Sequence, residues 1–163
     1  MNTSDIDRDR SLREHICYLL RGGDAHIHFP DVVTGFPSDL INSRIGDLPY
    51  TAWQVLEHMR IAQWDILEFS RKANHVSPKF PEGYWPDPSS EADHTNWQKS
   101  VEAFNVDLQE MHDLVMNPAT DLFTPIPHGD GQTILRQALL VADHNAYHLG
   151  TLMTMKKIGL TKG

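Results

Sequence analysis

The stretch TILRQALLVADHNAYHLGTLMTMKK, residues 133–157, is the part of the sequence that decides the fold. Its apolar residues recur at the three- and four-residue spacing of an amphipathic helix. His144 and His148 lie four residues apart within it. Because four residues make just over one helical turn, both imidazoles leave the helix on the same side and can reach one ion. The pattern predicts a long helix, from about Thr133 to Gly159, that carries two candidate metal ligands.

A second strongly periodic segment begins at Thr51, where Thr51 and Gln54 match a capping box. His58 lies on the apolar stripe of this predicted helix, three residues after Val55 and four before Ala62. Its imidazole is therefore expected to face the core. A third histidine thus joins the pair of the last helix, provided that the fold brings the two helices together.

Two further helices are expected, one before and one after this segment. The first begins at a capping box of Ser11 and Glu14 and ends at the glycines 22–23. The other spans residues 97–115, whose apolar side chains step by four and three in a heptad-like pattern. Gly150 does not suit the interior of the last helix, so we expect a close neighbour there.

The connecting segments complete the architecture. Residues 74–90, NHVSPKFPEGYWPDPSS, contain four prolines, which exclude a regular helix, and three aromatic residues, which argue against disorder. A loop of this length is typical of a crossover or a binding element. Residues 24–49 suggest one or two short helices, and no useful strand pattern is found. We predict an all-α protein, a four-helix bundle with a long crossover loop between the second and third helices, forming a single domain over residues 1–163.

Composition excludes several classes of function. The chain of 163 residues has 14 Lys and Arg against 22 Asp and Glu, a formal charge of −8. This balance argues against nonspecific binding to nucleic acid or to anionic membranes. No apolar run approaches the roughly 18 residues of a membrane span, and the charged N-terminus does not resemble a signal peptide. The lone Cys17 cannot form an internal disulfide and is expected to be buried. A cytoplasmic protein is predicted.

Three histidines from two helices suit a catalytic zinc site, which commonly uses three protein ligands and keeps one position open. Neutral imidazole also binds nickel, copper and iron. The alternative is that the histidines lie at the bundle edge, hydrogen-bonded to neighbours or to water. A zincin peptidase would carry Glu after the first histidine, but the residue here is Asn145. A peptidase is therefore disfavoured.

Two further residues are candidates for the site. Asp65 lies seven residues after His58 on the same helix face, so it is a candidate base or partner to a ligand imidazole; the alternative is a carboxylate at the rim. Tyr147 is a candidate hydrogen-bond donor in the pocket, and packing is its alternative role. Most of the remaining histidines are expected to face solvent: His15, His75, His94, His112 and His128.

Three blocks of sequence resemble the DinB/YfiT-like superfamily, and are most similar to its DinB-like branch. They are LPYTAWQVLEHMRIAQWDILEFS (48–70), SPKFPEGYWP (77–86) and HGDGQTILRQALLVADHNAYHLG (128–150). The resemblance implies a four-helix bundle with a crossover. It also implies a divalent metal, typically nickel or zinc, held by His58, His144 and His148, and a homodimer.

The resemblance does not name a substrate. Some members of the superfamily are thiol-dependent transferases or isomerases, others are described as hydrolases, and the family name refers to damage-induced expression. We therefore expect a metal-dependent enzyme that acts on a small-molecule substrate, with a low-molecular-weight thiol as cosubstrate in S-transfer or isomerisation. A metal-dependent hydrolase is one alternative. A non-catalytic, stress-associated metal-binding bundle is another, and a plain helical bundle is the last.

Overall fold

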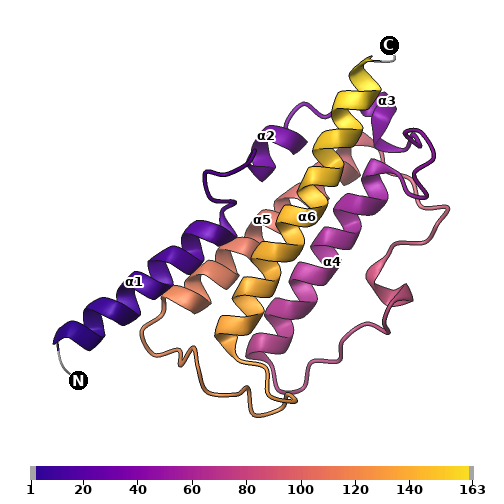
Figure 1. Ribbon diagram of the computed structural model, residues 1–163. Coiled ribbons are helices and arrows are strands. Elements are labelled where there is room, and N and C mark those ends of the chain that lie inside the picture. Colours follow the sequence, from indigo (N-terminus) through magenta and orange to yellow (C-terminus); the bar gives the residue numbers. More distant parts are fainter. Residues whose placement is uncertain (1–2, 162–163) are drawn as a thin grey trace.

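The computed structural model describes residues 3–161, and helices account for most of them (Figure 1). No strand occurs within this range, only two isolated bridges, so the predicted all-α class is confirmed. None of the described helices is both long and apolar enough to cross a membrane. The helices are α1 (Thr3–Leu20), α2 (Phe29–Val33), α3 (Ser38–Ile41), α4 (Ala52–Arg71), the 3-10 helix η1 (Glu82–Tyr84), α5 (His94–Met116) and α6 (Ile134–Thr161).

The four long helices lie side by side (Figure 1). α4 packs against both α5 and α6, and α1 packs against the same two helices. The segment 72–93 leaves the end of α4, runs back along that helix and enters α5 at the opposite end of the molecule (Figure 1). This return path places η1 beside α4, and it turns out to build one wall of the functional site.

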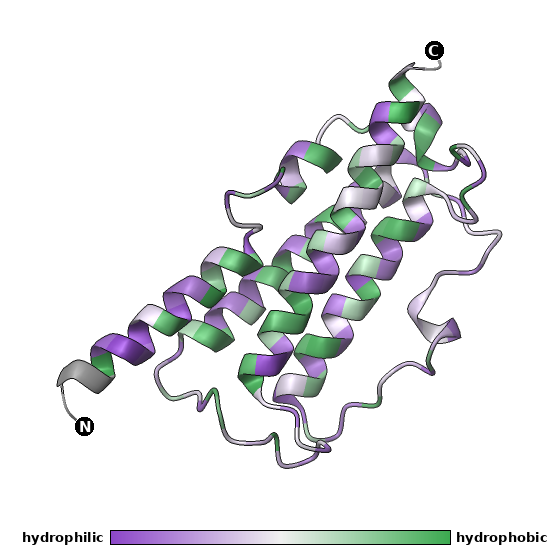
Figure 2. Cartoon of the chain, viewed as in Figure 1, coloured by the Kyte–Doolittle hydropathy of each residue, from purple (hydrophilic) through white to green (hydrophobic). Residues whose placement is uncertain are grey.

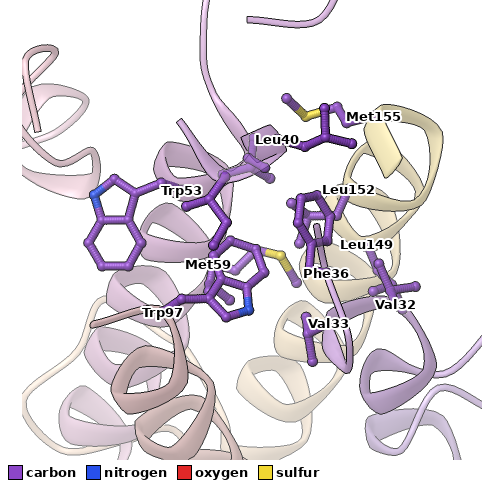
Figure 3. Packing of buried hydrophobic residues seen from close by; sticks show 14 of the residues in the cluster. Val32, Val33, Phe36, Leu40, Trp53, Met59, Trp97, Leu149, Leu152 and Met155 are labelled. Atoms are coloured by element: carbon purple, nitrogen blue, oxygen red, sulfur yellow. The ribbon is translucent and has the colours of Figure 1, made fainter. Parts of the chain in front are cut away.

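Two clusters of buried apolar side chains hold the helices together. Figure 2 shows hydrophobic and hydrophilic residues interleaved along every long helix, as amphipathic packing requires. One cluster joins α2 and α3 to the first half of α4 and the last half of α6 (Figure 3). Met59 and Leu152 are fully buried there, and Phe36 packs on Trp97 with ring centres 4.8 Å apart. The other cluster joins α1 to the opposite halves of α4, α5 and α6.

Of the sequence features expected at particular helix positions, one is confirmed and two are wrong. The predicted capping box of α4 is confirmed, because Thr51 accepts from the Gln54 amide and Gln54 accepts from the Thr51 amide. The predicted start at Ser11 is wrong, because α1 already begins at Thr3. The expected neighbour of Gly150 is also absent, since a Cβ built there would meet nothing within 4 Å among the described residues.

Candidate metal centre

The three predicted histidines meet at the level where the two apolar clusters adjoin. His58 projects from α4, and His144 and His148 project from α6 one turn apart. The α6 residues before them belong to one cluster and those after them to the other. Because α4 and α6 are direct neighbours, histidines 86 and 90 residues apart in sequence come into contact.

Their Nε2 atoms converge on one point. Nε2 of His58 lies 3.1 Å from Nε2 of His144 and 3.2 Å from Nε2 of His148. One ligand nitrogen from each of the three residues lies within 4.8 Å of the others. Two nitrogens bound tetrahedrally to zinc at the usual bond length are separated by roughly 3.3 Å. The spacing therefore fits a single divalent cation between the three rings.

The tautomer of His58 is set by a backbone contact. Its Nδ1 lies 2.8 Å from the carbonyl oxygen of Tyr84, which can only accept, so Nδ1 donates and Nε2 presents its lone pair to the other rings. The lone pair on Nε2 of His58 can accept a hydrogen bond from Nε2 of either His144 or His148, but not from both. A shared cation satisfies all three nitrogens at once, which is the chemical reason that this donor set suits a metal.

Burial keeps the three imidazoles in the form that binds metals. It lowers the pKa of His58, against the opposing effect of the hydrogen bond to the Tyr84 carbonyl. Burial, reinforced by the charge that a protonated His58 would carry, lowers the pKa of His144 to about 4. Burial and the other two rings lower the pKa of His148 to about 4. All three rings are therefore neutral at neutral pH, as metal ligands must be.

The proline-rich segment covers one side of the centre. Trp85 stacks on the ring of His58 with centroids 4.0 Å apart and an interplanar angle of 4°. Tyr50, which precedes α4, stacks in turn on Trp85 at 5.5 Å. The segment that the sequence predicted to be ordered but not helical is thus held against the site, with only η1 as regular structure. His58 is the one ligand ring whose Nδ1 is hydrogen-bonded among the described residues, and the Nδ1 of His144 is both buried and without a partner there.

Asp65 is connected to the centre through Tyr84. One carboxylate oxygen lies 2.7 Å from Nε2 of His75, and the other accepts a 2.6 Å hydrogen bond from the Tyr84 hydroxyl. Burial and Asp65 together raise the pKa of Tyr84 to about 12, so the phenol stays protonated and donates. A chain of contacts runs from His75 through Asp65 and Tyr84 to the backbone carbonyl that orients His58.

His75 is therefore a site residue that sequence reasoning missed. Its side chain is only 7% exposed, whereas it was grouped with histidines expected to face solvent. No local pattern around residue 75 signals a partner ten residues earlier in the chain, because the contact requires the chain to turn back after α4. Trp85 is another such residue: the sequence indicated only that the aromatic residues of its loop are ordered, and the structure stacks its ring on His58.

Tyr147 and Asn145 lie on either side of the α6 histidines. Tyr147 is 73% exposed, and its ring meets the ring of His148 edge-on at 4.8 Å, so it lies at the rim. Asn145, which occupies the place of a peptidase glutamate, is buried and donates to Gln63 at 2.7 Å. Its amide is directed at α4 and is not available as a base.

A cavity of about 450 Å³ opens beside the histidines. His58 and His144 line it, and so do Gln132, which precedes α6, and Arg136 in the first turn of that helix. The walls are mostly apolar or aromatic and come from α4, α6 and the proline-rich segment: Ala62, Ile66, Phe69, Phe80, Pro81, Tyr84, Trp85 and Leu140. The arrangement is a cluster of three neutral imidazoles, fit to hold a divalent cation, that faces a space large enough for a small molecule.

These features define an all-helical protein with a candidate three-histidine metal centre. The family model of the DinB superfamily matches residues 28–152, which include all three histidines and the proline-rich segment. The chain therefore belongs to the DinB superfamily, as the sequence resemblance predicted. Comparisons with curated proteins and with solved structures found no significant match.

Proposed function

We propose that this protein is a metal-dependent enzyme that joins a small thiol to an electrophilic small molecule, with His58, His144 and His148 holding a divalent cation. The observation that carries the proposal is the convergence of three imidazoles, two of which, His58 and His144, line a cavity. Nickel and zinc are the cations that we expect, because imidazole ligands suit both. Isomerisation belongs to the same proposal, since a thiol that adds to a substrate can also be eliminated from it.

The chemistry needs little from the protein beyond positioning. A bound divalent cation lowers the pKa of a coordinated thiol, so that the thiolate is available near neutral pH. The Tyr84 carbonyl and the Trp85 ring orient His58, and the apolar walls of the cavity keep water away from the sulfur. A carbon–sulfur bond then forms at the electrophilic carbon as the bond to the leaving group breaks. The leaving group takes the bonding electron pair, and the thiol proton passes to solvent.

The carboxylates near the site favour thiol transfer over hydrolysis. Asp65 is the one carboxylate among the described residues that line the cavity, and both of its oxygens are engaged by His75 and Tyr84. Water is a much weaker acid than a thiol, so its activation depends more on a base that takes its proton, whereas a coordinated thiol loses its proton to solvent more readily. Hydrolysis with Asp65 as the base is the second candidate, because this carboxylate does line the cavity. We also propose that the hydroxyl of Tyr147, at the rim beside His148, donates a hydrogen bond to the substrate.

Metal content is the first test. The full-length protein, loaded with nickel or zinc and then desalted, is expected to carry about one cation per chain by elemental analysis. His144→Ala and His148→Ala are expected to abolish this binding, because two imidazoles hold a divalent ion far less tightly than three. His94→Ala, which changes an exposed histidine at the start of α5, is the matched control and is expected to leave it unchanged. A wild-type chain that retains no cation would overturn the proposal.

Turnover is the second test. The loaded protein is incubated with a chromogenic electrophile, with and without a panel of small thiols, and product formation is followed spectroscopically. Transfer requires a rate that depends on both thiol and metal. Turnover of ester substrates that ignores thiol would favour the hydrolase. A loaded protein that is inert toward both panels would favour a non-catalytic, stress-associated metal-binding protein.

We extend the proposal to the arrangement of the helices, the location of the protein and its oligomeric state. We propose that α1, α4, α5 and α6 form one four-helix bundle and a single domain over residues 1–163, with 72–93 as the crossover, supported by the contacts among these helices. We also propose that the chain acts in the cytoplasm as a homodimer. Light scattering of the purified protein tests the dimer directly.

A further inference from the structure

The end of the cavity away from His58 and His144 carries a cation that the proposed chemistry does not use. Arg136, in the first turn of α6, lines the cavity together with Gln132 and Gln137. Arg136 is the one arginine or lysine among the described residues that line the cavity. In a chain whose formal net charge is −8, an arginine that lines a cavity, although its side chain is exposed, distinguishes that cavity from the general surface.

The guanidinium of Arg136 is also free to bind a ligand. The two arginines of α4 are paired with carboxylates, Arg60 with Glu57 and Arg71 with Glu68. The side-chain hydrogen bond of Arg136 goes instead to a neutral amide, with Nη1 lying 2.8 Å from Oε1 of Gln137. Gln137 is buried, so it holds the arginine side chain without neutralising its charge. A fork of N–H donors that has no acidic partner within residues 3–161 suits a carboxylate.

The geometry of α6 gives the length of the ligand. Arg136 and His144 are eight residues apart on one helix, a rise of about 12 Å. Allowing for the reach of the two side chains, a molecule that contacts both groups must extend over roughly 8–12 Å, which is on the order of eight single bonds of extended chain. Its middle would pass Ile66 and Leu140 on one side and the aromatic residues of the proline-rich segment on the other.

The walls indicate that this middle portion is apolar. Phe80 is 80% exposed and Leu140 is 38% exposed, although both line the cavity. Large apolar side chains left open to solvent beside a cavity gain most from a ligand that covers them. A ligand that fits this cavity has an anionic group at one end, an apolar middle, and at the other end a group that can bind beside the imidazoles.

We propose that the thiol cosubstrate is an elongated acid, whose sulfur lies at the three histidines and whose carboxylate is bound by Arg136. This inference rests on the proposed function, and it adds the substrate class and a specificity-determining residue. Arg136 does not touch the sulfur, so its substitution alters which thiols bind and leaves the metal in place.

The test uses the full chain loaded with cobalt(II), because a thiolate bound to this ion gives a charge-transfer absorption that reports binding without any turnover. The probes are ω-mercaptooctanoate, its uncharged counterpart ω-mercaptooctanol, and the short ω-mercaptopropionate. The long acid is expected to bind at least about fivefold more tightly than the long alcohol, a modest factor because the arginine is exposed. The short acid cannot span the cavity and is expected to show no such advantage.

Arg136→Gln is expected to abolish the preference for the acid while leaving alcohol binding and cobalt content unchanged. Arg136→Lys is expected to retain part of it, and added salt is expected to weaken it in the wild type. Arg8→Gln removes an exposed arginine of α1 and is the matched control. Equal binding of acid and alcohol by the wild type, or an unchanged preference in Arg136→Gln, would overturn this inference alone. A chain that takes up no cobalt would overturn the proposed function and this inference with it.

Discussion

The substitution Asp65→Asn tests how the chain orients its candidate metal ligands. Asp65 accepts hydrogen bonds of 2.7 Å and 2.6 Å from His75 and Tyr84, and only 6% of the residue is exposed. Asparagine keeps the shape but removes the charge, and it places an amide donor against one of two groups that already donate. Hydrogen bonds to a charged group contribute about 1.5–3 kcal/mol each, and asparagine retains a weaker neutral bond to one partner. We therefore expect a loss of roughly 2–4 kcal/mol in the free energy of unfolding.

Thermal unfolding of the metal-free protein measures this loss. For a chain of this size, about 1 kcal/mol shifts Tm by roughly 2–4 °C, so a decrease of roughly 4–16 °C is expected. Asp143→Asn changes an exposed carboxylate next to His144 and is expected to leave Tm within about 1–2 °C of the wild type, as surface substitutions commonly do. Tyr84→Phe removes one of the two hydrogen bonds and is expected to have an intermediate effect.

Metal affinity gives the second readout, because Asp65 positions the Tyr84 backbone that orients His58. Loss of such an outer contact weakens metal binding by about 10–100-fold in characterised sites. Competition with a chelator is therefore expected to show at least about tenfold weaker binding in Asp65→Asn than in Asp143→Asn. If the two variants match in both Tm and affinity, the proposed chain of contacts from Asp65 to the metal centre is refuted.

Three further predictions concern stability. Burial raises the pKa of Glu68, but the hydrogen bonds and charges of Lys72 and Arg71 together lower it below 4.5. The stability that ionised Glu68 contributes is therefore present at neutral pH and lost as the pH falls through the lowered pKa. The loss of unfolding free energy in Glu68→Gln, measured by urea unfolding, should accordingly shrink below about pH 4.5. Leu152→Ala empties a fully buried site and should cost about 2–5 kcal/mol, while Leu160→Ala at an exposed site should cost under about 0.5 kcal/mol. Thr51→Ala removes the N-cap of α4 and should lower the free energy of unfolding, again measured in urea, by about 0.5–2 kcal/mol.

The sequence correctly predicts features that depend on only a few turns of one helix. The capping box at Thr51 and the inward placement of His58 depend on contacts within α4 and on which face of the helix is apolar. The pairing of His144 with His148 follows from the helical repeat alone. Each of these features is set by the backbone of one element, so a short window of sequence contains the information that it needs.

The capping box at Ser11 shows how such a signal fails. The helix continues to Thr3 through a charged segment in which Asp9 pairs with Arg13, and Arg10 with Glu14, at a spacing of four residues. These pairs support a helix that carries few apolar residues. A cap motif marks a place where a helix can begin, but the helix extends past it when the preceding residues also favour that conformation.

The amino-acid order along α4 and α6 was enough to indicate three inward imidazoles and a family of helical proteins. The proline-rich segment indicated a crossover after α4, but not which residues the returning chain contacts: Trp85 stacks on His58, His75 binds Asp65, and aromatic side chains line the same cavity as Arg136. That path depends on contacts between residues far apart in the chain, and their energies are set by distances in space that no periodicity encodes. Local repeats were therefore enough to identify the three candidate ligands, whereas the residues that surround and cover them were determined by the packing of the helices.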